Sequence, residues 1–447
     1  MKKLFSIFTI ALTLACSTFA GGDQGTIPTI IPATTLKSIP PGARIAVMGD
    51  SITEQKNYSR FIEAYLLACA GRKDIAVCNY GWGGERASGF ADRAECELAF
   101  FKPTIVTLCY GMNDGGYRPY NDSIGRNYEQ SMRAGLTKLK IIGVSHVLVG
   151  TPGAVDTKYF NPVNTKYLTG PWPEAGKTAA EGYNANLRAL GDIGYTLAGE
   201  CKQIYVDVHT PLINAMKTAK SVLGDDYDVC GMDGIHPRGN GGLVMAYAFI
   251  KGLGCDGAIG EITVDLKANT ATSGNGHTIT GCRNGVVKLE STRYPFCFDA
   301  ETKSSASTRS ILPYVPFNRE LNRFILRATN IPAARMQVKW GALSKEFTRE
   351  QLDEGINLAA EFEKTPFDEK FMQFLKLVAK KQFAEAEIVR GVIANLRMVD
   401  LPKDPETEKA LDLIKSKLSE KRNKLEQELH DSLTAISHTI SIIPVDK

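Results

Sequence analysis

Two short polar turns in this 447-residue chain hold the side chains needed for nucleophilic catalysis. Ser51 lies in the turn at residues 49–53, and Asp233 and His236 lie in the turn at residues 233–237. A serine hydroxyl is a poor nucleophile until a base removes its proton, and His236 could be that base. Asp233 could fix the imidazole tautomer and stabilise the imidazolium. This combination favours attack on an ester carbonyl.

Two further turns, at residues 79–84 and 111–114, could stabilise the oxyanion that such an attack creates. The candidate donors are the backbone N–H groups of Ser51 and Gly84 and the side-chain amide of Asn113. Removing one donor of this kind typically lowers the rate about 100- to 1000-fold. Glycine at position 84 would let the backbone approach closely, because no side chain stands in the way.

A repeating strand–helix pattern would bring these turns together. Short apolar runs predict five strands, at residues 44–48, 74–79, 104–110, 146–150 and 203–208. Their continuous apolarity is typical of parallel strands buried on both faces. Helix-like stretches alternate with them, at residues 58–70, 91–100, 124–142, 179–199 and 242–253. The alternation predicts a doubly wound α/β sandwich, in which ligands bind beyond the carboxyl ends of the strands.

The four turns resemble the signature blocks of the SGNH hydrolases, also called the GDSL esterase/lipase family. The matching positions are Ser51, Gly84, Asn113 and His236, with Asp233 at the place of the family's acid. The resemblance covers about residues 40–257 and implies a flavodoxin-like three-layer α/β/α sandwich with a parallel sheet. It also implies that Ser51 is the nucleophile, that His236 is the base, and that Ser51, Gly84 and Asn113 form the oxyanion hole.

Each motif has a simpler interpretation beside this one. The turn around Ser51 could by itself be an ordinary helix cap, and Asp233 and His236 could ligate a metal ion together with Cys230. No fourth ligand is apparent and Ser51 needs a base, so we expect no metal and no cofactor. His209 is interpreted as structural. The chain has no Gly-x-Ser-x-Gly, which excludes the ordinary α/β-hydrolase elbow.

Composition excludes several other classes of protein. The chain has 53 basic and 49 acidic residues, a net charge of +4, which offers no case for a nucleic-acid partner. After the N-terminal segment, no stretch reaches about 18 uninterrupted apolar residues, so no transmembrane helix is expected. With 43% hydrophobic residues the chain can bury a substantial core.

The N-terminal 20 residues have the pattern of a secretory signal peptide. A lysine pair precedes an apolar run at residues 4–15, and small residues at 18 and 20 favour cleavage after Ala20. We therefore expect a secreted or periplasmic protein. Lipid anchoring through Cys16 is the weaker alternative, because Thr13 stands where such signals usually carry Leu. Export permits disulfides, and Cys282 and Cys297 are the predicted pair.

The sequence changes character beyond the catalytic region. Residues 258–342 alternate polar and apolar side chains between Gly and Asn turns, which predicts a small antiparallel β region. Residues 343–447 are predicted to be helical. Apolar residues form one stripe along the last predicted helix: Leu411, Ile414, Leu418, Leu425, Leu429, Leu433, Ile436 and Ile440. We interpret it as a packed helix with a solvated outer face rather than a partner-binding helix.

A long loop at residues 153–177 suggests the kind of substrate. It carries four aromatic residues, Tyr159, Phe160, Tyr167 and Trp172, among hydrogen-bonding side chains. Such a mixture suits stacking on sugar rings. We therefore predict a secreted esterase that removes small acyl groups, acetyl above all, from polysaccharides. Two alternatives stay open: a lipid acyl hydrolase of the lysophospholipase or longer-chain type, and a carbohydrate-binding or envelope scaffold protein.

Overall fold

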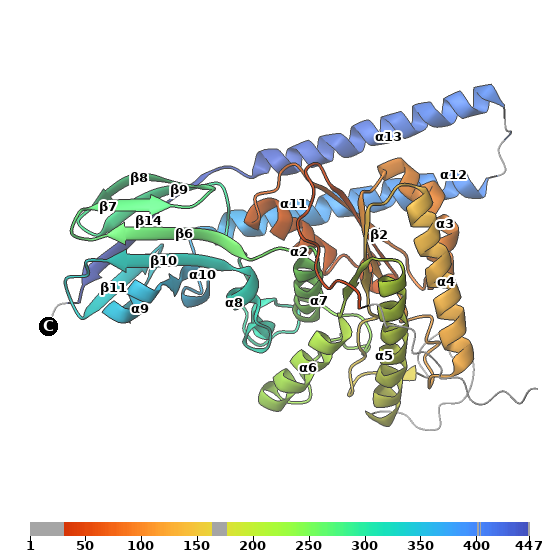
Figure 1. The fold of residues 1–447 in the computed structure, drawn as a ribbon, viewed down its shortest axis with the longest axis horizontal. Helices are drawn as coiled ribbons and strands as arrows, with labels where there is room; N and C mark the ends of the chain where they lie inside the picture. The colour runs from red at the N-terminus through yellow and green to blue at the C-terminus, as the bar shows by residue number, and fades with distance from the viewer. Residues whose placement is uncertain (1–30, 163–176, 400–401, 403, 446–447) are drawn as a thin grey trace, which may run out of the picture.

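The computed structural model describes residues 31–162, 177–399, 402 and 404–445. The predicted signal peptide and Cys16 lie outside the described residues, as do Tyr167 and Trp172. Figure 1 shows the chain as an α/β body at one end, a stack of β-strands at the other, and long helices that run along the α/β body. Within the described ranges, no helix is both long and apolar enough to cross a bilayer.

The α/β body is built on five parallel strands in the order β2-β1-β3-β4-β5. They are β1 (Arg44–Gly49), β2 (Ala76–Gly81), β3 (Ile105–Cys109), β4 (His146–Gly150) and β5 (Ile204–Val206). Their side chains are almost all buried, as expected for a parallel sheet covered on both faces. From β1 the strand order runs to β2 on one side and to β3, β4 and β5 on the other. The topological switch point therefore lies between β1 and β3, and ligands bind at such a point in doubly wound sheets.

Helices cover both faces of this sheet (Figure 1). On one face lie α3 (Ala87–Phe101), α4 (Asp122–Ile141) and part of α5 (Lys177–Glu200). The other face is covered by α2 (Ser59–Ala64), the π-helix η1 (Tyr65–Cys69), α6 (His209–Leu223) and α7 (Gly239–Gly252). The predicted three-layer α/β/α sandwich is thus confirmed. Helix α6 is absent from the sequence-based prediction.

Two further sheets stack on each other beyond α7. One has the order β13-β10-β6-β7 and contains β6 (Ala258–Asp265), β7 (Thr270–Ser273), β10 (Arg323–Thr329) and β13 (Ile356–Asn357). The other has the order β12-β11-β14-β9-β8 and contains β8 (His277–Arg283), β9 (Val286–Ser291), β11 (Arg335–Trp340), β12 (Leu343–Thr348) and β14 (Ile436–Pro444). The ring of Phe324 in the first sheet lies 5.5 Å from that of Trp340 in the second.

The predicted β region is wrong in two respects. It is not wholly antiparallel, because β6 and β10 pair in parallel. It also does not end at residue 342, because β12, β13 and β14 complete the two sheets. Between β9 and β10 the chain forms the 3-10 helix η3 (Arg309–Tyr314) and α8 (Phe317–Leu321).

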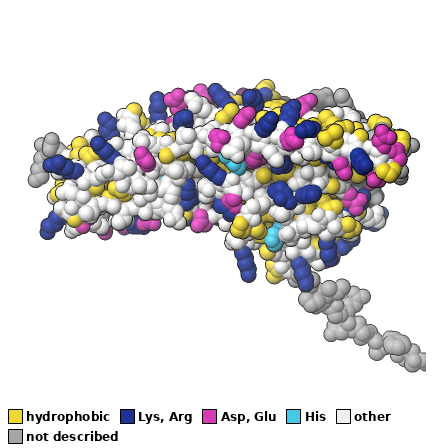
Figure 2. All heavy atoms as spheres, turned by 90° about the horizontal axis from the view of Figure 1, so that it is seen from above, with side chains coloured by type: hydrophobic (Ala, Val, Ile, Leu, Met, Phe, Trp, Pro, Cys, Tyr) yellow, Lys and Arg dark blue, Asp and Glu magenta, His cyan; other side chains and the backbone are white. Residues whose placement is uncertain are grey.

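Helices make up much of the C-terminal part: α9 (Arg349–Glu354), α10 (Leu358–Glu361), α11 (Asp368–Ala386), the π-helix η4 (Glu387–Ile393), α12 (Ala394–Met398) and α13 (Pro405–Ser432). We call α11, η4, α12 and α13 the helical arm. It runs along the α/β body in Figure 1. On the face seen in Figure 2, basic and acidic side chains are interspersed and form no single-sign patch.

The prediction that the last helix continues through Ile436 and Ile440 is wrong. Helix α13 ends at Ser432, and Ile436–Pro444 is strand β14 between β9 and β11. Residues four apart share a face in a strand as well as in a helix, so the stripe fits both structures. The buried residues His438, Ile440 and Ile442 alternate with serine and threonine. This alternation is typical of a strand and not of a helix.

The predicted disulfide is also wrong, because all nine cysteines in the described residues are free thiols. Cys282 lies on β8, an edge strand of the second sheet. After β9 the chain turns back to the α/β body, where the backbone N–H of Tyr294 donates to the carbonyl of Ala68. Cys297 is therefore buried in the core, and its thiol lies against the carbonyl of Pro295.

Candidate active site

Ser51 is the first residue of α1 (Ser51–Glu54), which begins directly after β1. Asp50 caps this helix, since its side chain accepts a hydrogen bond of 2.9 Å from the backbone N–H of Ile52. The end of β2 packs tightly on the same turn. A Cβ added to Gly81 would lie 2.1 Å from the backbone nitrogen of Glu54, so only glycine fits there. The serine turn is thus held between two adjacent strands.

A hydrogen-bonded chain links Ser51, His236 and Asp233. The Oγ of Ser51 lies 2.7 Å from Nε2 of His236, and Nδ1 of His236 lies 2.5 Å from Oδ2 of Asp233. The other carboxylate oxygen of Asp233 accepts from the backbone N–H groups of Ile235 and His236. With its proton on Nδ1, the imidazole presents the Nε2 lone pair to the serine hydroxyl.

The carboxyl of Asp233 stays ionised despite its surroundings. Partial burial alone would raise its pKa, but hydrogen bonds from the His236 ring and from the backbone N–H groups of His236 and Ile235 hold the pKa below its ordinary value. A negative charge beside Nδ1 stabilises the imidazolium that forms when His236 takes a proton. The electrostatics therefore suit a histidine base.

The polar turns after β2 and β3 meet beside the serine. Gly84 has a φ of +73°, a left-handed conformation that favours glycine. Asn113 is buried, and its Nδ2 donates a 3.0 Å hydrogen bond to the carbonyl of Glu85, next to Gly84. Its Oδ1 accepts from the hydroxyl of Tyr117 at 2.9 Å, which sets the orientation of the amide. The second N–H of this amide can donate to an oxyanion.

A buried network that the sequence did not reveal supports this turn. Both carboxylate oxygens of Glu85 accept from the Arg93 guanidinium at 2.6 Å, and the Tyr110 hydroxyl donates to the same carboxylate. Arg93 also pairs with Glu97 at 2.7 Å and donates to the carbonyl of Tyr80. Arg93 and Glu97 lie four residues apart on α3, a spacing that allows them to pair. Glu85 and Tyr110 lie in the turns after β2 and β3, and nothing in the sequence indicates that they join this pair.

Two aspartates beside the site are unusually hard to ionise. Burial raises the pKa of Asp50 to about 7, although the hydrogen bond from the Ile52 N–H and the nearby His236 oppose the rise. Burial likewise raises the pKa of Asp114 to about 6, against hydrogen bonds from the backbone N–H groups of Ala87 and Gly111. Both carboxyls bind backbone of the catalytic turns and act as structural caps.

The described aromatic residues of the long loop do not form an exposed platform. Phe160 is buried and stacks on Tyr117 and Tyr183, so the prediction that it contacts substrate is wrong. A Cβ added to Gly234 would lie 2.3 Å from the backbone nitrogen of Phe160, so the loop packs directly on the histidine turn. Tyr159 is half-buried, and its hydroxyl donates to the carbonyl of Asp226.

A cavity of about 990 Å³ lies between α5 and α6. Arg188, His209 and Lys220 are among its lining residues, but Ser51, Asp233 and His236 are not, so we do not assign it to the catalytic chemistry. The Nδ1 of His209 lies 2.7 Å from the carbonyl of Gly153, and burial lowers the pKa of His209. Across the described residues, no cluster of three or more Cys, His, Asp or Glu side chains could hold a metal ion.

Comparison with known proteins agrees with this architecture. Residues 47–242 match the profile of the GDSL-like lipase/acylhydrolase family. BT4096, described as a gut microbial diltiazem-metabolizing enzyme, is 20% identical, with a TM-score of 0.70 over 92% of this chain and 100% of its own. Axe2, an acetylxylan esterase from Geobacillus stearothermophilus, is 20% identical, with a TM-score of 0.37 over 49% of this chain and 97% of its own. Curated proteins gave no significant match.

The likeness to BT4096 concerns the fold, and it extends over the β-sheets and the helical arm as well as the α/β body. The family profile covers a narrower region, which includes all four polar turns. The α/β body built on β1–β5 is therefore a GDSL-like lipase/acylhydrolase domain, an ester-bond hydrolase domain of the SGNH type.

Proposed function

We propose that this protein is an exported serine esterase that removes small acyl groups, acetyl above all, from polysaccharides. The observation that carries the proposal is the hydrogen-bonded chain from Ser51 through His236 to Asp233 at the carboxyl edge of the sheet. The buried amide of Asn113 beside Gly84 supports an oxyanion hole. The signal-peptide pattern of the first 20 residues supports export.

In the first half of the reaction, Ser51 Oγ attacks the ester carbonyl carbon and its proton passes to Nε2 of His236. The carbonyl electron pair moves onto oxygen, where the N–H groups of Ser51, Gly84 and Asn113 donate to it. When the intermediate collapses, the bond to the leaving alkoxide breaks and the alkoxide takes the proton from Nε2. The product is an acyl ester on Ser51 and a free alcohol.

In the second half, water attacks the acyl carbon and gives its proton to Nε2 of His236. The same donors hold the second oxyanion. Collapse breaks the bond to Ser51 Oγ, which takes back the proton, and the carboxylic acid leaves. Asp233 keeps the imidazole in one tautomer throughout and remains ionised, consistent with its lowered pKa.

The carbohydrate preference rests on the loop at residues 153–177. Its described part packs on the histidine turn, since the backbone N–H of Asp156 donates to the carbonyl of Gly234. The loop thus starts beside the catalytic base and carries aromatic and hydrogen-bonding residues of the kind that bind sugars. One observation favours a longer-chain acyl substrate instead: Met232, directly before Asp233, is 62% exposed.

The test is hydrolysis of p-nitrophenyl esters, from acetate to laurate, by residues 21–447 and by the Ser51→Ala variant. We expect serine-dependent turnover that is fastest on acetate, followed by acetate release from acetylated polysaccharides. A maximum at long acyl chains would replace this substrate by a lipid. Equal rates for wild type and Ser51→Ala would remove the proposed nucleophile and leave a binding or scaffold role to the C-terminal half.

A further inference from the structure

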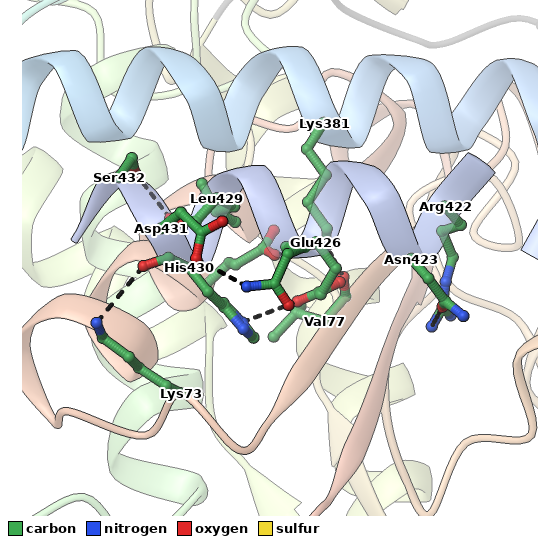
Figure 3. A network of polar contacts seen from close by, with 12 residues as sticks. Lys73, Val77, Lys381, Arg422, Asn423, Glu426, Leu429, His430, Asp431 and Ser432 are labelled. Carbon is green, nitrogen blue, oxygen red and sulfur yellow. Dashed lines mark hydrogen bonds and ion pairs between the residues drawn. The ribbon is translucent and has the colours of Figure 1, made fainter. Parts of the chain in front are cut away.

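The helical arm is anchored to the α/β body by a buried charged cluster around Lys381 of α11 (Figure 3). The Nζ of Lys381 lies 2.6 Å from both the Glu63 carboxylate of α2 and the carbonyl of Val77 in β2. It also pairs with Glu385 at 3.2 Å and with Glu426 of α13 at 3.1 Å. The Lys381 side chain is 2% exposed, so these contacts are shielded from solvent.

From this cluster a chain of hydrogen bonds leads to the serine turn. Gln382, next to Lys381, accepts a 2.7 Å hydrogen bond from the Ser59 hydroxyl. That hydroxyl accepts from Nδ2 of Asn79, which also donates to the carbonyl of Thr53 at 2.8 Å. The Oδ1 of Asn79 accepts from the backbone N–H of Gly81. The arm is thus linked to the backbone two residues after Ser51 and to the start of the turn that leads to Gly84.

The arm reaches the same two turns directly through Arg390. The Arg390 guanidinium pairs with the carboxylate of Glu54, the last residue of α1. It also lies over the ring of Trp82, at 5.0 Å from the ring centroid, two residues before Gly84. Arg390 stands in η4, a π-helical turn, and such turns are frequent at functional sites. The widened turn thus lies where the arm contacts α1 and the turn after β2.

The charge of Glu54 makes this contact important for the reaction. A Cβ added to Gly83 would lie only 2.4 Å from Oε2 of Glu54, so the carboxylate lies against the turn that carries the Gly84 N–H. An unpaired negative charge there would oppose the oxyanion that develops in the transition state. Arg390 neutralises that charge, and its stacking on Trp82 holds the turn in place.

We propose that Arg390 is a positioning residue for catalysis, and that the helical arm completes the active site by neutralising Glu54 beside the oxyanion hole. The proposal rests on the proposed esterase function. It makes the C-terminal segment part of the catalytic unit. Arg390 acts through Glu54 and Trp82 and does not touch the reacting atoms.

The first experiment measures kcat and KM on p-nitrophenyl acetate for the wild type and for Arg390→Ala. We expect kcat to fall about tenfold with little change in KM, because the charge acts on the oxyanion rather than on the bound ester. The Arg390 and Glu54 side chains are 37% and 27% exposed, so the melting temperature of the variant should stay close to that of the wild type. The matched control is Arg422→Ala, which removes a similar stacking contact, on Phe101, outside the catalytic turns. Its kcat should equal that of the wild type.

The decisive variant is Glu54→Gln combined with Arg390→Ala. Removing the unpaired carboxylate should restore kcat to within about threefold of the wild type. If the double variant is as slow as Arg390→Ala, or if Arg390→Ala keeps the wild-type kcat, the proposal is wrong. Failure of the proposed function would look different, because the wild type itself would then show no Ser51-dependent turnover. If Arg390→Ala does not fold, Arg390→Lys, which keeps the charge, must retain kcat to support the proposal.

Discussion

Two sets of linked ionisable side chains lie at opposite ends of β2 and its neighbours, and they differ in their access to water. In the candidate catalytic set, the His236 side chain is 24% exposed and that of Asp233 53% exposed. In the set under the helical arm, the Lys381 side chain is 2% exposed and that of Glu63 is fully buried. The first set is open to solvent, as the proposed proton transfers require. The second holds two parts of the chain together.

The two sets also treat charge differently. Asp233 faces one partner, and its hydrogen bonds lower its pKa. Around Lys381 three carboxylates share one cation, and burial raises the pKa of Glu63 to about 8 even though Lys381 opposes the rise. A catalytic dyad needs a stable ionised acid, whereas a buried anchor only needs its hydrogen bonds satisfied. Loss of a member should therefore affect activity in one set and stability in the other.

The largest effect should come from His236→Ala. Without a base the serine proton has no acceptor, so kcat on p-nitrophenyl acetate should fall at least about 10³-fold. The melting temperature should change little, because the ring is partly exposed and lies at the sheet edge. Loss of cooperative unfolding in this variant would contradict the distinction between a catalytic and a structural set.

Lys381→Met should have the largest effect on stability. It leaves Glu63, Glu385 and Glu426 without their shared cation, and breaking a buried pair in this way costs about 3–5 kcal/mol. Urea unfolding monitored by circular dichroism measures this free energy. A loss below about 1 kcal/mol would show that the cluster is not the anchor of the arm.

Asp50→Asn should have a smaller effect that depends on pH. The pKa of Asp50 rises from 3.8 in the unfolded chain to about 7 in the fold, so the folded state holds a proton that the unfolded state releases. Stability from this group is therefore full below about pH 4 and is lost as the pH rises toward 7. Asparagine cannot ionise and still caps a helix. Thermal melts should show a gain of about 1–3 kcal/mol at pH 8 and none at pH 4.

The smallest effect should come from a second lysine that binds the arm. Lys73 Nζ donates to the carbonyl of Leu433 at 2.7 Å, in a contact that is only partly buried. It also reaches the carbonyl of His430 near the end of α13 (Figure 3). Lys73→Ala should cost about 0.5–1.5 kcal/mol and leave kcat unchanged. Comparing it with Lys381→Met under the same conditions isolates the contribution of burial. Equal losses for the two lysines would mean that burial of the anchor is unimportant.

The sequence predicted well the parts of the molecule in which local pattern and chemistry coincide. Apolar runs that end in polar turns located β1 to β5 within a few residues, since parallel strands buried on both faces leave an uninterrupted signal. The same turns contain Ser51, Asp233 and His236, which the structure joins by hydrogen bonds. Their catalytic roles stay a prediction until the variants are measured.

Contacts between distant segments were not predictable from a single sequence. Lys381 and Arg390 look like ordinary surface residues of a charged helix, yet one is buried against β2 and the other pairs with Glu54. Phe160 fits the composition of a binding loop, but it packs in the core because the histidine turn approaches its backbone. In each case the partner lies far away in the sequence, and no periodicity encodes it.

Strand β14 has a consequence for the way the chain acquires its fold. It pairs with β9 on one side and β11 on the other, and these two strands do not pair with each other. Both are synthesised before β14, so each lacks this partner until β14 is made. Until residues 436–444 arrive, both would expose unpaired edges that invite aggregation. Such long-range closure is slow and exposes the unfinished chain to proteases and chaperones. A chain stalled before residue 436 would thus be recognisable as incomplete, even with Ser51, Asp233 and His236 already synthesised.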